Sequence, residues 1–105
     1  MTLGDLRRLP LLQTRAIVAS CEDTETFAYI LDCLNRFYRG DYGKVAQEDS
    51  DANNRDLRAG EGHILARYEG RYNMLDRDIY IESHFSESVP GIDANNTLIM
   101  YCNER

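Results

Sequence analysis

The sequence has no tryptophan, only two prolines and two histidines, and a single lysine beside eleven arginines. No apolar run approaches the ~20 residues that a membrane-spanning helix needs, and the opening MTLGDLRRLPLL lacks the apolar core of a signal peptide. Three cysteines, Cys21, Cys33 and Cys102, are an odd number without C-x-x-C spacing. These absences favour a cytoplasmic protein with free thiols, no metal and no cofactor.

The charge of the chain is negative and unevenly distributed. Over 105 residues, 43% are apolar, enough for the core of one domain, and the net charge is -6. Residues 1–15 hold three arginines and one aspartate, a balance of +2, so the remaining residues carry -8. Phosphate backbones repel so acidic a body, which excludes direct nucleic-acid binding and favours a basic protein as partner.

The first half of the chain predicts one strand and two helices after a short arm, residues 1–12. Residues 13–20 (QTRAIVAS) favour a strand because Ile17 and Val18 lie at their centre. Apolar residues at helical spacing from Phe27 onward predict an amphipathic helix, with Asp23 or Thr24 as its cap and Gly40 after its end. A second, very polar helix is expected over residues 45–58.

The second half predicts three strands, over residues 63–69, 78–83 and 97–103, with a long loop before the last of them. The whole chain, 1–105, therefore predicts a single α+β domain in the order β-α-α-β-β-β. An antiparallel sheet of three to four strands is expected to carry two helices packed on one face. The place of the first strand in this sheet stays open.

Two clusters of polar residues allow a chemical or a structural interpretation. Asp49 and Asn53 share one face of the polar helix and could bind a cation, but they favour a role in capping the neighbouring glycine turn. Glu82 and His84 could form part of a metal or catalytic site, but no third ligand has the required spacing. No motif of an enzyme is present, which predicts a non-enzymatic protein.

The acidic residues form two patches along the sequence, either of which could bind a basic partner or simply keep the protein soluble. Tyrosine is enriched at recognition surfaces, and one tyrosine lies beside the first patch. The predicted partner-binding residues are Asp41, Tyr42, Glu48, Asp49 and Asp51 in the first patch, and Asp78, Glu82, Glu87 and Asp93 in the second.

The stretch from Gly40 onward resembles a family of small phage and plasmid accessory proteins, whose members have a Gly-Asp-Trp-Gly turn followed by an acidic helix and a strand. The resemblance covers about residues 14–102. It departs from the family at Tyr42, where members have tryptophan, and in a longer loop over 83–96. The matching residues are Gly40-Asp41-Tyr42-Gly43, Glu48-Asp49, Ala52-Asn53, Gly62, Ile64-Leu65-Ala66-Arg67-Tyr68 and Ile79-Tyr80-Ile81-Glu82.

The resemblance implies a gene of a mobile element, whose product acts in the cytoplasm of a bacterial host cell, and such genes often block host defences. We therefore expect an inhibitor of a host defence system, an anti-CRISPR protein whose acidic surface mimics nucleic acid and binds a CRISPR effector. The alternative is a small module that sequesters a nucleotide signal. That module would need a pocket with converging side chains, drawn from Arg36, Arg39, Tyr42, Arg67 and Tyr68. A homodimer through an exposed strand edge is compatible with either function.

Overall fold

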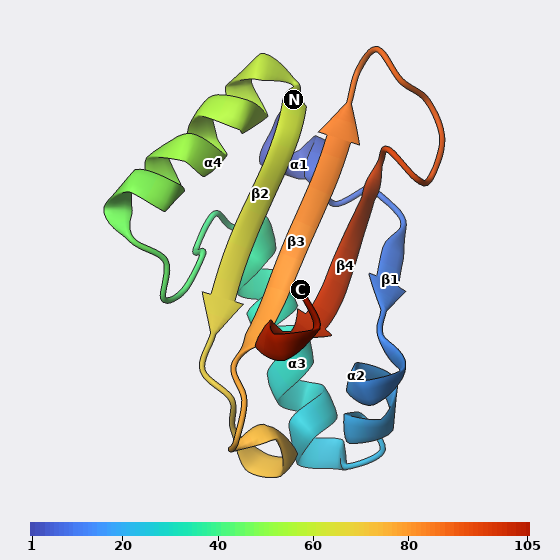
Figure 1. Cartoon of the computed structure of the whole chain (residues 1–105), viewed down its shortest axis with the longest axis vertical. Coiled ribbons are helices and arrows are strands. Elements are labelled where there is room, and N and C mark those ends of the chain that lie inside the picture. Colours follow the sequence, from blue (N-terminus) through green and yellow to red (C-terminus); the bar gives the residue numbers. More distant parts are fainter.

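The computed structural model describes residues 1–105 and confirms an α+β fold with one four-stranded sheet, in the strand order β1-β4-β3-β2 (Figure 1). The helices are α1 (Leu3–Leu6), α2 (Arg15–Ser20), α3 (Thr24–Tyr38) and α4 (Gln47–Ala59). The strands are β1 (Leu11–Gln13), β2 (Glu61–Tyr68), β3 (Ile79–Ser86) and β4 (Asn96–Tyr101). Two short 3-10 turns, η1 (Tyr72–Met74) and η2 (Cys102–Glu104), complete the chain.

The three C-terminal strands form the predicted antiparallel meander, with Ile81 of β3 opposite Ala66 of β2 and Ile99 of β4. Alternate residues of these strands face the core, as the pattern of hydrophobic residues predicts. The fourth strand, β1, lies beside β4 and runs parallel to it, with Leu12 in register with Leu98. The sheet is therefore mixed rather than wholly antiparallel.

The prediction of a strand over residues 13–20 is wrong, because Gln13 ends β1 and residues 15–20 form helix α2. The Thr14 hydroxyl accepts a hydrogen bond from the Ile17 amide at 3.3 Å and so caps the helix. Ile17 is fully buried, whereas Val18 is 55% exposed. In so short a segment, one buried β-branched side chain and a cap outweigh the β propensity of the Ile-Val pair.

The prediction of an N-terminal arm over residues 1–12 is also wrong, because this segment belongs to the fold. Thr2 and Asp5 form a reciprocal capping box around α1. Leu6 is fully buried in the hydrophobic core, and the chain then continues into β1 at Leu11. This edge strand is short and its side chains are exposed.

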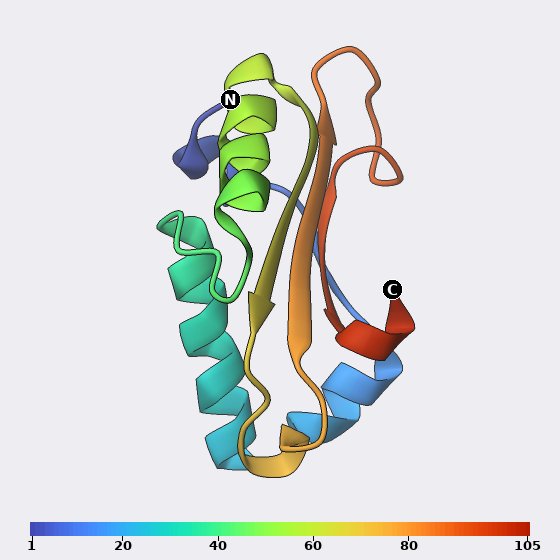
Figure 2. The same ribbon diagram turned by 60° about the vertical axis from the view of Figure 1, so that its left-hand side comes forward.

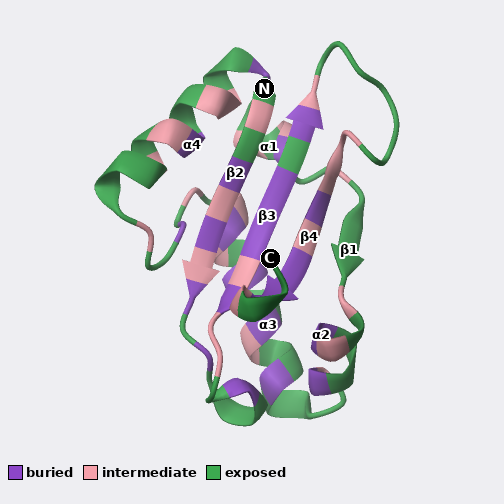
Figure 3. Ribbon diagram, in the orientation of Figure 1, coloured by how far each residue is buried: buried purple, intermediate pink, exposed green.

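The long amphipathic helix is confirmed as α3. Asp23 is its cap and accepts a hydrogen bond from the Thr26 amide at 3.0 Å. Ile30 and Phe37 are buried against the sheet, and Gly40 follows the helix with a φ of 82°. Figure 2 shows α3 covering one face of the sheet, and Figure 3 shows the buried positions that this layer produces.

The second helix, α4, lies along the outer edge of β2 rather than beneath the sheet with α3 (Figures 1 and 2). Its only buried residue is Asn53, which explains why the apolar stripe in its sequence is so thin. The opposite face of the sheet from α3 is left largely open, apart from the C-terminal turn η2. None of the helices combines the length and the apolar composition needed to cross a membrane.

Candidate functional site

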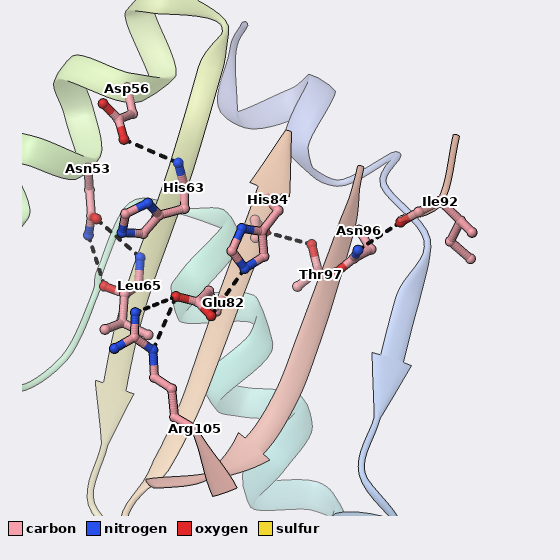
Figure 4. A network of polar contacts seen from close by, with 11 residues as sticks. Asn53, Asp56, His63, Leu65, Glu82, His84, Ile92, Asn96, Thr97 and Arg105 are labelled. Carbon is pink, nitrogen blue, oxygen red and sulfur yellow. Dashed lines mark hydrogen bonds and ion pairs between the residues drawn. The ribbon is translucent and has the colours of Figure 1, made fainter. Parts of the chain in front are cut away.

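The outer edge of β2 is closed by side chains of α4 instead of a fifth strand. Asn53 donates through Nδ2 to the Leu65 carbonyl at 2.9 Å and accepts from the Leu65 amide at 3.1 Å. Its side-chain amide therefore takes the place of a peptide group of a neighbouring strand (Figure 4). One turn further along α4, the Asp56 carboxylate accepts from the His63 amide at 3.1 Å. These bonds fix the helix to the sheet and satisfy backbone groups that would otherwise be free.

The glycine turn before α4 closes the rest of the same edge. The Arg67 amide donates to the Tyr42 carbonyl at 3.1 Å, and the Lys44 amide donates to the Arg67 carbonyl at 2.7 Å. Gly43 has a φ of 71°, and glycine tolerates this conformation best. The turn and the acidic helix together thus close the edge of β2. The prediction that Asp49 and Asn53 cap the glycine turn is wrong, because Asn53 bonds to Leu65 of β2 and the Gly43 amide donates to Asp41 instead.

Two of the predicted acidic residues are paired with cations within the fold. Asp41 accepts from Nε of Arg36 at 2.7 Å and from the Gly43 amide at 3.1 Å. The bond from Arg36 is the main reason that the pKa of Asp41 is lowered. Asp78 lies 2.7 Å from Nε of Arg67 and 3.0 Å from Nζ of Lys44. Both carboxylates hold the glycine turn and β2 in place, so they contribute little free charge to a partner.

Glu82 is buried on the open face of the sheet and is also paired. Its Oε2 lies 2.8 Å from Nη2 of Arg105, and its Oε1 lies 3.2 Å from Nε2 of His84 (Figure 4). Burial opposes ionisation of this carboxyl, but the bond and charge of Arg105, helped by His84, lower its pKa. No group of three or more His, Cys, Asp or Glu side chains in the chain is placed to hold a metal ion.

Removing the cation from this pair is expected to change the acid stability of the protein. The ordinary pKa of a glutamate carboxyl is 4.5 and that of Glu82 is lower, so the pair stabilises the fold fully above that pH. This stability is lost as the pH falls through the folded-state pKa. We expect Arg105→Gln to lower the free energy of unfolding by about 1–3 kcal/mol near neutral pH.

Urea unfolding of the wild type and of Arg105→Gln between about pH 7 and pH 3 measures this effect. The two free energies of unfolding are expected to converge toward acid pH, because both proteins then carry a protonated Glu82. Arg58→Gln, which changes an exposed arginine of α4, controls for the change in net charge. A difference that stays constant across this pH range would show that Arg105 does not act through the Glu82 carboxylate.

Three of the predicted acidic residues remain free at the start of α4, and we call them the acidic helix end: Glu48, Asp49 and Asp51. All three are exposed, and none takes part in the ion pairs that neutralise the other carboxylates. One side-chain hydrogen bond reaches the group: Nε2 of Gln47 donates to Oδ1 of Asp51 at 2.9 Å. Because Ala46 offers no side-chain cap, Glu48 and Asp49 also stabilise the first turn through the helix dipole.

A groove of about 350 Å³ separates α4 from the open face of the sheet. Asp49 and Asp56 line its helical wall, and Arg105 lies on the other side. These two aspartates are seven residues apart, hence about 10 Å apart along one helix face. The acidic helix end therefore continues into a groove with carboxylates on one wall. The full lining is Asp49, Ala52, Asn53, Asp56, His63, Leu65 and Arg105.

The remaining predicted residues do not join this surface. Glu87 lies by the other end of α4, where its carboxylate is 3.7 Å from the N-terminal amine and close to Gly60. Asp93 is exposed in the loop between β3 and β4, which Asn95 ties together by bonds to the Val89 and Gly91 carbonyls. The residues of the second patch therefore do not form one surface. Glu87 and Asp93 lie in different surroundings, and Asp78 and Glu82 are each paired with a cation.

The tyrosine of the glycine turn belongs to the core rather than to the surface. Tyr42 is only 4% exposed, packs edge-on against Phe37 and donates its hydroxyl to Asn54 at 3.1 Å. Of the residues required for a nucleotide pocket, Arg36, Arg67 and Tyr68 do line one cavity. Arg39 and Tyr42 do not contribute to that cavity.

Comparison of the chain with protein-family models, with curated proteins and with solved structures finds no match. The resemblance to accessory proteins of mobile elements therefore remains a prediction from the residues that carry it.

Several residues of this region escape prediction from the sequence. His63 of β2 lies directly opposite His84 of the adjacent strand β3, with 6.0 Å between the ring centroids. Arg105 reaches Glu82, 23 positions away. Neither pair follows from spacing along the sequence. The pairing of β2 with β3 places His63 beside His84, and the turn η2 places Arg105 near Glu82. Asp56 carries a weak signal, because it follows Asn53 and Asp49 on one helical face.

Proposed function

We propose that this protein is a non-enzymatic inhibitor encoded by a mobile element, which binds a basic surface of a host defence complex through the acidic helix end. The expected target is a CRISPR effector, whose nucleic-acid channel would supply that surface. One observation carries the proposal: Glu48, Asp49 and Asp51 are exposed and have no cationic partner in the chain. Most other carboxylates of the two predicted patches are paired or serve the fold.

The density of charge at the acidic helix end supports mimicry of nucleic acid. Residues 48 to 51 span about 4.5 Å along the helix axis, and three negative charges lie within that length. Double-stranded DNA carries one charge per ~1.7 Å of its axis. The two densities are similar, so arginines and lysines spaced to contact phosphates can contact these carboxylates.

The rigidity of α4 supports the same function. Asn53 and Asp56 bind the helix to the β2 backbone at 2.9–3.1 Å. The backbone that carries the acidic helix end is therefore held in place before a partner binds. A surface that is ordered in advance loses less conformational entropy on binding. The groove beside Asp49 and Asp56 offers a place for one cationic side chain of the partner.

Neutralising the acidic helix end is expected to abolish most of the inhibition. In a cleavage assay with a purified, guide-loaded CRISPR nuclease, we expect the triple variant Glu48→Gln, Asp49→Asn, Asp51→Asn to need at least ~10-fold more protein for half inhibition. Loss of even one charge-assisted contact is worth that factor. The fold of the variant is checked by its thermal midpoint, because Glu48 and Asp49 also stabilise the first turn of α4.

The matched control is Glu22→Gln, Glu25→Gln, Asp32→Asn, which removes three exposed carboxylates at or near α3 and includes one in the first turn of that helix. It changes the net charge by the same amount and removes one first-turn carboxylate where the test variant removes two, and it should inhibit as the wild type does. Equal inhibition by both triple variants would contradict a role for the acidic helix end. Failure of the wild type to inhibit or bind any guide-loaded effector would contradict the proposed target.

A further inference from the structure

Helix α3 passes the β2–β3 connection at the end of the molecule away from the start of β2 (Figure 2). Residues of these segments line two adjoining cavities. Their volumes are about 430 and 250 Å³, and they share Tyr29, Arg36 and Arg71 as a common wall. We call the two cavities together the arginine–tyrosine depression. The larger one is also lined by Glu25, Ala28, Asp32 and Tyr72, and the smaller one by Gly43, Lys44, Arg67, Tyr68 and Glu69.

The smaller cavity is cationic in an otherwise acidic protein. Four of its eight lining residues are basic and only Glu69 is acidic. Arg36 is paired with Asp41, and two more of the cations, Lys44 and Arg67, share the single carboxylate of Asp78. Arg71 has no closer carboxylate than that of Glu69, at 3.9 Å, and its side chain is 59% exposed. Charge-assisted donors thus remain for an anion, and a phosphate group is the anion that arginine and lysine bind best.

The larger cavity is bordered by aromatic rings. Tyr29 and Tyr72 meet edge to face with 6.1 Å between centroids, and the Arg71 guanidinium lies 5.4 Å from the Tyr29 centroid. The Arg36 guanidinium lies 4.9 Å from the centroid of Tyr68 in the same way. Rings and guanidinium planes of this kind stack on the flat faces of nucleobases.

Tyr72 is held in a strained backbone conformation beside this cavity. With a φ of 56°, it is the single non-glycine residue of the chain in the left-handed region, and it is 50% exposed. The turn around it is fixed because Met74 is fully buried and the Asn73 amide donates to Oγ1 of Thr26 at 3.2 Å. An exposed aromatic ring in a costly backbone conformation is typical of binding sites.

We propose that the arginine–tyrosine depression binds a free nucleotide, with its phosphates in the smaller cavity and its base against Tyr29 and Tyr72. Glu25 and Asp32, on the wall of the larger cavity, provide acceptors for sugar hydroxyls or an exocyclic amino group. A cavity of this size holds one small ligand. A nucleic-acid strand fits less well, because the chain as a whole carries a net charge of -6. This site is separate from the acidic helix end and does not depend on the proposed inhibition.

Isothermal titration calorimetry of the full chain with ATP, ADP, AMP and inorganic phosphate tests this proposal. We expect saturable binding of at least one nucleotide at a ratio of one per chain. Arg71→Gln should weaken that binding roughly tenfold or more, since it removes a charged donor. Tyr72→Asn should also weaken it while leaving the thermal midpoint unchanged or higher, because asparagine adopts φ > 0 more easily than tyrosine.

Arg39→Gln is the matched control, because it removes one nearby exposed arginine that lines neither cavity. It should bind the nucleotide as the wild type does. Three outcomes would overturn the proposal: no binding of any nucleotide, equal binding of inorganic phosphate alone, or unchanged affinity in both Arg71→Gln and Tyr72→Asn. Tighter binding of a single-stranded oligonucleotide than of any free nucleotide would also overturn it.

Discussion

Replacing Asn53 by alanine is expected to lower the free energy of unfolding by about 2–4 kcal/mol. The Asn53 side chain is 4% exposed and makes both hydrogen bonds to the Leu65 peptide groups at the edge of β2. Alanine would leave the partly buried amide and carbonyl of Leu65 without partners, and each unsatisfied buried group costs about 1–3 kcal/mol. The gain in helix propensity from asparagine to alanine, less than about 0.7 kcal/mol, offsets only part of this loss.

Urea unfolding followed by circular dichroism measures the effect of Asn53→Ala. Arg55→Ala is the control on the same helix, since the Arg55 side chain is exposed and makes no hydrogen bond or ion pair in the structure. This control should change the free energy of unfolding by less than about 0.5 kcal/mol. A loss below about 1 kcal/mol for Asn53→Ala would mean that water satisfies the β2 edge just as well. In that case the Asn53 side chain is not what holds α4 to the sheet.

Replacing Gly43 by alanine is expected to destabilise the protein by about 3 kcal/mol or more. A Cβ atom at this position would overlap the Arg67 carbonyl oxygen and lie 2.8 Å from Cδ1 of Tyr68. The Lys44 amide donates to the same Arg67 carbonyl at 2.7 Å, so the turn cannot move away without losing an edge bond. The φ of 71° adds backbone strain for any residue other than glycine.

Gly91→Ala is the matched control for this substitution. Gly91 has a φ of 105°, but a Cβ atom there would meet no atom within 4 Å. The control therefore carries a backbone strain without the steric overlap, and we expect it to cost about 1–2 kcal/mol. Equal losses for the two variants in urea unfolding would show that close approach of the turn to β2 is not what requires glycine at position 43.

The sequence predicted best the elements whose own side chains form the core. Helix α3 has apolar residues at regular helical spacing, a side-chain cap at Asp23 and a glycine after its end. All of these signals agree, so the helix was located almost to the residue. The meander of β2, β3 and β4 follows for the same reason, because alternate residues are apolar.

The N-terminal third was predicted least well, because short elements carry weak signals. Helix α2 has six residues, too few for a periodic pattern to outweigh the β propensity of Ile17 and Val18. The capping box of Thr2 and Asp5 is visible in the sequence and marks the start of α1. The parallel pairing of β1 with β4 depends on contacts between residues almost 90 positions apart, which no local pattern contains.

The candidate site was predicted only in part, because sequence position does not show which charges are neutralised. Asp78 and Glu82 lie in an acidic stretch of the sequence, yet each finds a cation far along the chain. Glu48 and Asp49 find none, although Lys44 and Arg55 lie within seven positions of them in the sequence. Strand register and the course of the glycine turn decide these pairings, and neither follows from composition.

We propose that the acidic helix end binds a basic nucleic-acid channel, and the decisive measurement is the affinity for a purified, guide-loaded CRISPR effector at several salt concentrations. We predict that log K falls linearly with log salt concentration, that target DNA competes with the protein, and that the Glu48, Asp49, Asp51 triple variant flattens this slope. Binding that does not change with salt, or that occurs equally in the presence of target DNA, would contradict binding of the acidic helix end in this channel.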